Sequence, residues 1–117
     1  MKYFKISEFD SPDLPGSGQR MDVSFLEKLD NARELAGVPF KITSAYRTEK
    51  HNRAVGGELK SSHLSGVAVD IATSNDVVRF KLVSALLKIG FSRLGIGKDF
   101  VHVDDDKNKS GGVIWTY

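Results

Sequence analysis

Two histidines and one aspartate are spaced in this chain as ligands of a divalent metal ion. His63 and Asp70 lie seven residues apart in the segment 61–70 (SSHLSGVAVD), and His102 follows in a short apolar segment downstream. Imidazole nitrogens and carboxylate oxygens both bind Zn²⁺. Three protein ligands leave the fourth tetrahedral position open to water, which is the stoichiometry of a catalytic zinc site, whereas structural sites close all four positions. The chain has no cysteine, so thiolate sites and disulfides are excluded.

Each of these residues also has an ordinary structural interpretation. A single histidine is more often a hydrogen-bonded polar residue than a ligand, and a single buried aspartate is more often a helix cap or an ion-pair partner. The combination of the three, with small residues between His63 and Asp70, favours a metal site. The third histidine, His51, adjoins Asn52 and Arg53, and we interpret it as a surface residue or one that supports the ligands.

Three other catalytic motifs are absent or incomplete. No His-Glu-x-x-His motif occurs, and the segment 95–98 (GIGK) lacks the length and the Ser/Thr of a phosphate-binding loop. No Gly-x-Ser-x-Gly turn presents a serine nucleophile.

Composition indicates an ordinary globular domain of 117 residues, 40% hydrophobic and 27% charged, with a formal net charge of +2. No basic run is interleaved with aromatic residues, so we expect no nucleic-acid partner. No segment has the length and hydropathy of a signal peptide or a membrane span. We therefore expect synthesis in the cytoplasm without membrane insertion, and one domain over residues 1–117 whose residues 1–20 form an N-terminal arm pinned by Phe4, Ile6 and Phe9.

Two long helices and several short strands must position the candidate ligands. Asp22 and Gly37 are start and stop signals for one helix, and Thr73 or Ser74 and Gly90 are those for a second, whose expected apolar stripe is Phe80, Val83, Leu86 and Leu87. A short third helix is expected after Thr48. Period-two patterns predict strands at 39–43, 67–72, 93–96, 100–104 and 113–117.

Strand alternation places Asp70 on the same face as Ala68 and Ala72, opposite Val69 and Ile71. A face lined by small residues leaves room for an ion beside the carboxylate. The last strands are close enough in sequence to pair as antiparallel hairpins. The predicted class is α+β, with an antiparallel sheet packed against two main helices.

The pattern Ser61-x-His63-x-x-Gly66-x-Ala68-x-Asp70, followed by His102 in a short strand, resembles the zinc peptidases of the D-alanyl-D-alanine carboxypeptidase and peptidoglycan endopeptidase family (peptidase family M15). The resemblance extends to the segments 42–47 (ITSAYR), 51–57 (HNRAVGG) and 115–117 (WTY). It implies the fold shared with the hedgehog signalling domain, and the small single-domain form resembles phage or prophage members.

The resemblance implies that His63, Asp70 and His102 bind zinc. In relatives the general base is an acidic residue three positions before the last histidine, which here is Asp99. Asp replaces the glutamate common in carboxypeptidase members, and Val101 replaces a frequent tryptophan. Strand geometry offers a second candidate, Asp104, which falls on the same face as His102 and could instead orient its imidazole.

Arg47 corresponds to the family arginine that meets substrate oxygens, and a guanidinium binds carboxylate in a bidentate manner. Ser61 is expected to hydrogen-bond the substrate or the metal loop. The implied reaction is hydrolysis of peptidoglycan stem peptides, either removal of a terminal D-Ala or cleavage within the peptide, such as at L-Ala to D-Glu. A non-catalytic zinc-containing wall-binding module is the alternative outside the enzymes.

Overall fold

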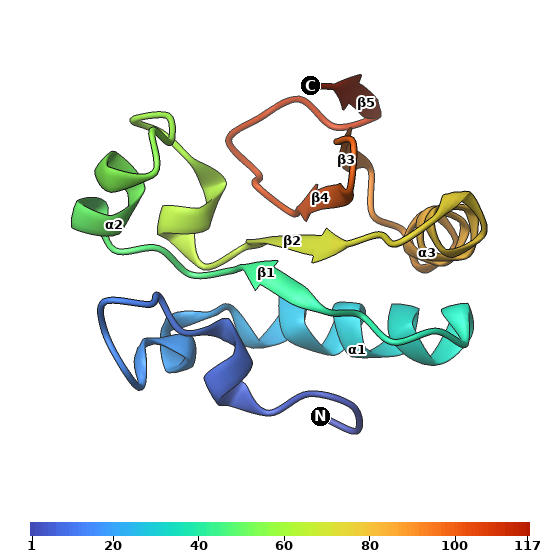
Figure 1. Cartoon of the computed structure of the whole chain (residues 1–117), viewed down its shortest axis with the longest axis horizontal. Coiled ribbons are helices and arrows are strands. Elements are labelled where there is room, and N and C mark those ends of the chain that lie inside the picture. The colour runs from blue at the N-terminus through green and yellow to red at the C-terminus, as the bar shows by residue number, and fades with distance from the viewer.

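A five-stranded sheet organises the domain. A computed structural model describes all residues from 1 to 117 (Figure 1). The strands follow the spatial order β1-β2-β4-β3-β5. Their bounds are β1 Ile42–Ser44, β2 Ala68–Ala72, β3 Arg93–Ile96, β4 Phe100–Asp104 and β5 Val113–Thr116. Together with three α-helices, this sheet gives the α+β class that the sequence predicts.

The last strand does not pair in the antiparallel hairpin that the sequence predicts. The pairs β1–β2, β2–β4 and β3–β4 are antiparallel, but β5 pairs with β3 in parallel. The connection after β4 crosses to the far side of β3 instead of folding back onto β4. Since β3 already runs opposite to β4, a strand that returns beyond it must run parallel to β3.

Two of the three α-helices begin at the expected cap residues. α1 spans Val23–Ala36 and α2 spans Glu49–Ala54, and the side chains of Asp22 and Thr48 accept the hydrogen bonds of the first turns. α3 spans Asp76–Ile89, but its cap is Asn75, whose side chain accepts from the backbone N–H of Val78. The expectation of Thr73 or Ser74 as cap was wrong by one or two residues.

One face of the sheet and the helices α1 and α3 enclose the hydrophobic core. The sheet contributes Val69, Ile71, Leu94, Val101 and Val103. The helices and the segment after α3 add large side chains such as Phe25, Leu29, Leu82, Leu86 and Phe91, and the Phe25 and Phe91 rings meet edge to face. The other face of the sheet therefore remains available for polar chemistry.

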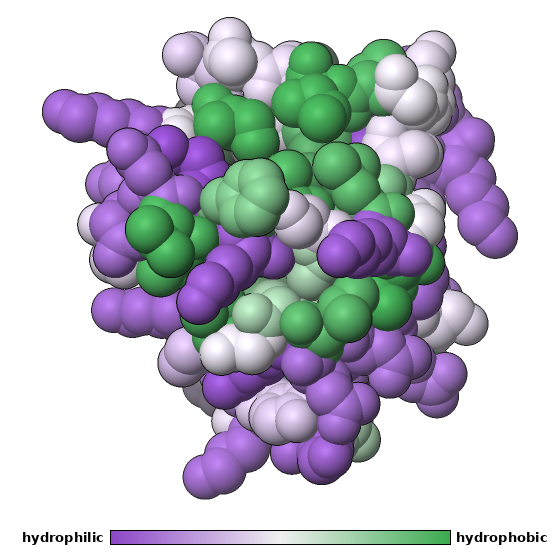
Figure 2. Space-filling model, turned by 90° about the vertical axis from the view of Figure 1, so that its right-hand side faces the viewer, coloured by the Kyte–Doolittle hydropathy of each residue, from purple (hydrophilic) through white to green (hydrophobic).

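Two expected core residues lie on the surface instead. α3 buries Leu82, Ala85 and Leu86, whereas Phe80 is 74% exposed and Leu87 is exposed too. Apolar residues occupy most sides of this helix, so its periodicity does not fix the buried side. Figure 2, which views the molecule from the right-hand side of Figure 1, shows apolar side chains gathered on its surface.

The first 20 residues form short 3₁₀ helices at Ile6–Phe9 and Ser17–Arg20. Phe4 and Phe9 are buried in the core, as expected for residues that pin an arm, but Ile6 is exposed. None of the helices in the chain is both long and apolar enough to span a membrane.

Candidate metal centre

The face of the sheet opposite the core carries a row of residues that crosses four strands. Asp70 of β2 pairs with His102 of β4, and Gly95 of β3 pairs with both His102 and Trp115 of β5. Residues that pair directly across strands project to the same face. Register alone therefore sets the Asp70 carboxylate beside the His102 imidazole, although 32 residues separate them in sequence.

His63 comes from the loop before β2. It lies in a 3₁₀ helix, Ser62–Ser65, whose first turn is capped by the Ser61 side chain, and Gly66 ends that helix at a φ of 71°. A Cβ at Gly66 would lie 2.5 Å from the carbonyl oxygen of Arg20, so only glycine suits both the conformation and the space. After this sharp turn the chain enters β2, and the His63 side chain lies beside Asp70 of that strand.

The three side chains present a set of donor atoms that fits a single zinc ion. Their candidate ligand atoms lie within 4.8 Å of one another. The Nδ1 atom of His63 lies 2.7 Å from the carbonyl oxygen of Ala45, which can only accept, so Nδ1 carries the hydrogen and the Nε2 lone pair is available. That Nε2 atom lies 3.4 Å from the Asp70 carboxylate. Two imidazoles and one carboxylate are a common catalytic zinc ligand set.

The His102 ring is held from both sides by carboxylates. Its Nδ1 lies 2.9 Å from Asp70 Oδ1 and its Nε2 lies 2.7 Å from Asp104 Oδ2. Asp104 is itself buried, and its Oδ1 accepts a 2.7 Å bond from Arg93 Nε. A carboxylate behind a metal-binding histidine fixes the ring and its tautomer. Asp104 thus directs the Nδ1 atom of His102 towards Asp70 and the site.

The same contacts shift the protonation of the cluster. Burial lowers the pKa of His102, but hydrogen bonds to Asp104 and Asp70 outweigh it and leave the pKa above its ordinary value. Burial raises the pKa of Asp70, but the contacts with His102 and His63 outweigh it and lower the pKa well below its usual range. These contacts therefore stabilise the protonated form of His102 more than for an ordinary histidine.

We expect zinc affinity to fall as the pH decreases through the raised pKa of His102. Zinc binding requires Nδ1 of His102 to lose its proton. Because the raised pKa means that this proton is held more tightly, it competes with zinc at a higher pH than the proton of an ordinary histidine would. Competition titration against a chromogenic chelator between pH 8.5 and 5.5 measures this dependence. An affinity that stays constant from pH 7.5 to 6 would contradict the predicted coupling.

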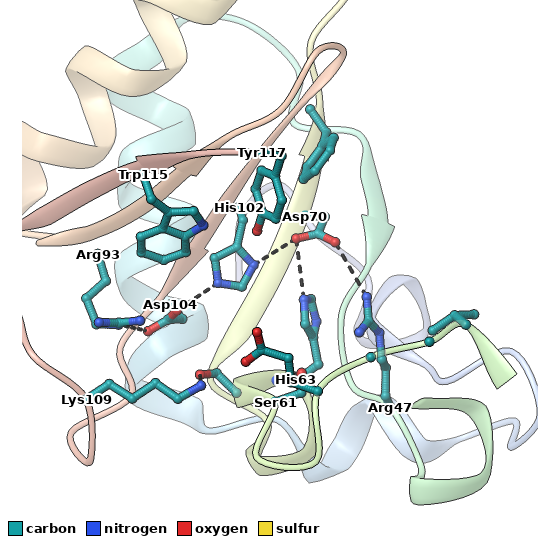
Figure 3. Close-up of a pocket in the computed structure, with 16 residues that line it drawn as sticks. Arg47, Ser61, His63, Asp70, Arg93, His102, Asp104, Lys109, Trp115 and Tyr117 are labelled. Atoms are coloured by element: carbon teal, nitrogen blue, oxygen red, sulfur yellow. Dashed lines mark hydrogen bonds and ion pairs between the residues drawn. The ribbon is translucent and has the colours of Figure 1, made fainter. Parts of the chain in front are cut away.

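The cluster lies at the base of a cavity of about 590 Å³. Figure 3 shows Arg47 on one side of Asp70, and Tyr117 and Trp115 on the side of His102. Arg47 Nη2 lies 3.7 Å from Asp70 Oδ2, while its other nitrogens bond Ser44 and Asn52. Ser61 and the segment 55–58 also line the cavity.

The structure brings together most, but not all, of the residues that the sequence singles out. Arg47, Ser61, His63, Asp70 and His102 line the same cavity. Asp99 is exposed in the turn between β3 and β4 and does not line the cavity, whereas the rival carboxylate of Asp104 does. His51 is partly buried in α2 and is not part of the cluster.

Sequence reasoning assigned no role in the site to several lining residues, among them Arg93, Phe100, Lys109, Trp115 and Tyr117, although the segment 115–117 is part of the family resemblance. The alternation of Trp115 and Tyr117 along the last strand was a signal that both share one face. Which face that is depends on the parallel β3–β5 pairing, which local sequence does not reveal.

The fold and the site define an α+β domain with a candidate three-ligand metal centre in an open cleft, an arrangement that single-zinc hydrolases use. The family model described as Peptidase M15 matches residues 3–104, a range that includes all three candidate ligands. The chain therefore belongs to the M15 peptidases, a family of zinc-dependent enzymes. No curated protein matches the chain.

Proposed function

We propose that this protein is a zinc-dependent peptidase that hydrolyses peptide bonds in bacterial peptidoglycan stem peptides, of the D-Ala-D-Ala carboxypeptidase type. The observation that carries the proposal is the His63–Asp70–His102 cluster, whose ring nitrogens are oriented by Ala45 and Asp104 towards one point in the cleft. Since the wall lies outside the cytoplasm, this function requires release by a phage lysis system or another export route.

In this proposal His63, Asp70 and His102 hold the metal. Bound zinc would polarise the scissile carbonyl and lower the pKa of a bound water towards about 7. Arg47 binds the carboxylate of the substrate, because its guanidinium reaches the cavity beside Asp70 and its remaining N–H groups are fixed by Ser44 and Asn52.

Ser61 contributes a hydroxyl to the lining of the cleft. Its oxygen accepts a 3.3 Å hydrogen bond from the backbone N–H of His63. Its own O–H can donate a hydrogen bond to a carbonyl oxygen of the substrate. Ser61 would therefore couple substrate binding to the loop that presents His63.

Two carboxylates compete for the role of general base. We retain Asp99, which the family pattern favours, although its turn lies outside the cavity, because catalytic contacts often form only when substrate is bound. Asp104 already lines the cavity, but both of its oxygens are engaged by His102, Arg93 and the backbone N–H of Asp106. Those bonds support an orienting role for Asp104.

Two alternatives share the same metal centre. An endopeptidase of the L-Ala-D-Glu type would use the same residues on an internal bond. A non-catalytic wall-binding module would hold zinc and bind wall peptides without turnover.

Digestion of purified peptidoglycan by the zinc-loaded protein, followed by mass spectrometry, tests the proposal. We expect loss of terminal D-Ala from pentapeptide stems, and no product after chelation. Fragments cut between L-Ala and D-Glu would instead identify an endopeptidase. Intact peptidoglycan after prolonged digestion, with zinc bound, would contradict any enzymatic function and favour the binding module.

A further inference from the structure

Three aromatic side chains form one wall of the cleft, and Gly95 and Gly97 make room for them, since a Cβ at Gly97 would meet the Phe100 ring. Phe100 and Tyr117 rings lie 5.0 Å apart, and the Trp115 ring lies 5.5 Å from the His102 ring. A Cβ at Gly95 would lie 2.5 Å from Trp115 Nε1 and 2.9 Å from Tyr117 Cε2. The rings therefore lie directly against the backbone of β3, which no other residue at Gly95 would permit.

This packing brings the hydroxyl end of Tyr117 to the metal cluster. The Cε2 atom, next to the carbon that bears the hydroxyl, covers Gly95, and Gly95 pairs directly with His102. Figure 3 shows the Tyr117 oxygen directed towards His102 and Asp70, across the cleft from Arg47. The backbone N–H of Tyr117 bonds the carbonyl of Ile96, which anchors the residue to β3.

The environment keeps the phenol protonated, as a hydrogen-bond donor. Burial raises the pKa of Tyr117, the nearby Trp115 indole opposes this, and the carboxylates of Asp70, Asp104 and Glu58 raise it further. A neutral phenol near a metal centre can donate to an oxygen on which negative charge develops.

We propose that Tyr117 is a catalytic residue whose hydroxyl donates a hydrogen bond to the carbonyl oxygen of the scissile peptide. This inference rests on the proposed peptidase function. The contact strengthens as the carbonyl oxygen gains charge, so it stabilises the transition state more than the bound substrate. Arg47, on the other side of Asp70, remains free to bind the carboxylate of the substrate.

The Tyr117→Phe variant tests this role, because it removes only the hydroxyl and keeps the ring that packs on Phe100 and Gly95. We expect kcat to fall about tenfold to a hundredfold with KM nearly unchanged. Affinity for a phosphinate analogue of D-Ala-D-Ala, measured by calorimetry on the zinc-loaded protein, should fall by a similar factor. If the digest identifies the L-Ala-D-Glu bond, the phosphinate analogue of that bond is the probe.

Tyr3→Phe is the matched control, since the Tyr3 hydroxyl contacts Glu34 away from the cleft and its loss should change neither quantity. Zinc content and melting temperature should be the same in all three proteins. If Tyr117→Phe retains both wild-type kcat and wild-type phosphinate affinity, the role of Tyr117 is overturned while the peptidase function stands. If the wild-type protein neither cleaves nor binds the phosphinate, the proposed function fails, and this inference fails with it.

Discussion

His63→Ala is expected to lose both bound zinc and peptidase activity. The His63 side chain is buried, and the carbonyl of Ala45 fixes its ring with Nε2 towards Asp70. Removal leaves only Asp70 and His102 as protein ligands, and no other imidazole lies in the cleft to replace it. Loss of a residue that hydrogen-bonds a metal ligand typically weakens metal affinity about 10- to 100-fold. Loss of the ligand itself should therefore weaken zinc affinity more than roughly 100-fold.

Metal content by elemental mass spectrometry and zinc affinity by chelator competition measure this effect. Treatment with chelator should abolish the activity of the wild-type protein and added zinc should restore it, whereas zinc should not restore the variant. His51→Ala is the matched control, because His51 belongs to α2 and is not part of the cluster. A His63→Ala protein that is folded and retains a full equivalent of zinc would show that the ligand assignment is wrong.

The second large effect is expected at the general base. Asp99→Asn should reduce kcat by about 10²- to 10⁴-fold while zinc content stays at one equivalent, because the amide cannot accept the proton of the attacking water. Asp104→Asn should act differently. It removes the charge behind His102 and should weaken zinc binding by about 10- to 100-fold, with activity recovering when zinc is in excess.

Kinetics at saturating zinc separate the two carboxylates. Because Asp99 lies outside the cavity, the comparison is a stringent test of the family pattern. Should Asp99→Asn retain wild-type kcat while Asp104→Asn remains inactive in excess zinc, Asp104 would be the base and Asp99 an ordinary turn residue.

Local signals in the sequence predict the long helices and the central strands. The cap residue Asp22 and the terminal Gly37 define α1, and the bounds of β3 and β4 agree with their period-two patterns. Local signals fail where several neighbours share the same property. Asn75 follows two other residues able to cap α3, and the apolar surroundings of Phe80 hide which side of the helix is buried.

In the candidate site, too, local sequence predicts the position of some residues, and contacts between distant strands determine the position of the others. Alternation along β2 correctly places Asp70 opposite the core residues Val69 and Ile71. The partners of Asp104 and the wall that contains Tyr117 depend on contacts between distant strands, above all the parallel pairing of β5 with β3. No property of an isolated segment specifies that pairing, so the structure was needed to place Arg93 and Tyr117 beside the metal ligands.

The row of paired residues that crosses β2, β4, β3 and β5 restricts where the chain can be lengthened by protein engineering. Because side chains alternate along a strand, a single residue inserted within β4 would turn the His102 imidazole into the core and set valine beside the Asp70 carboxylate. Insertions in the connection 105–112 would leave that alignment intact. Loop grafts and sequence libraries aimed at changing substrate preference should therefore target that connection and preserve the length of the strands.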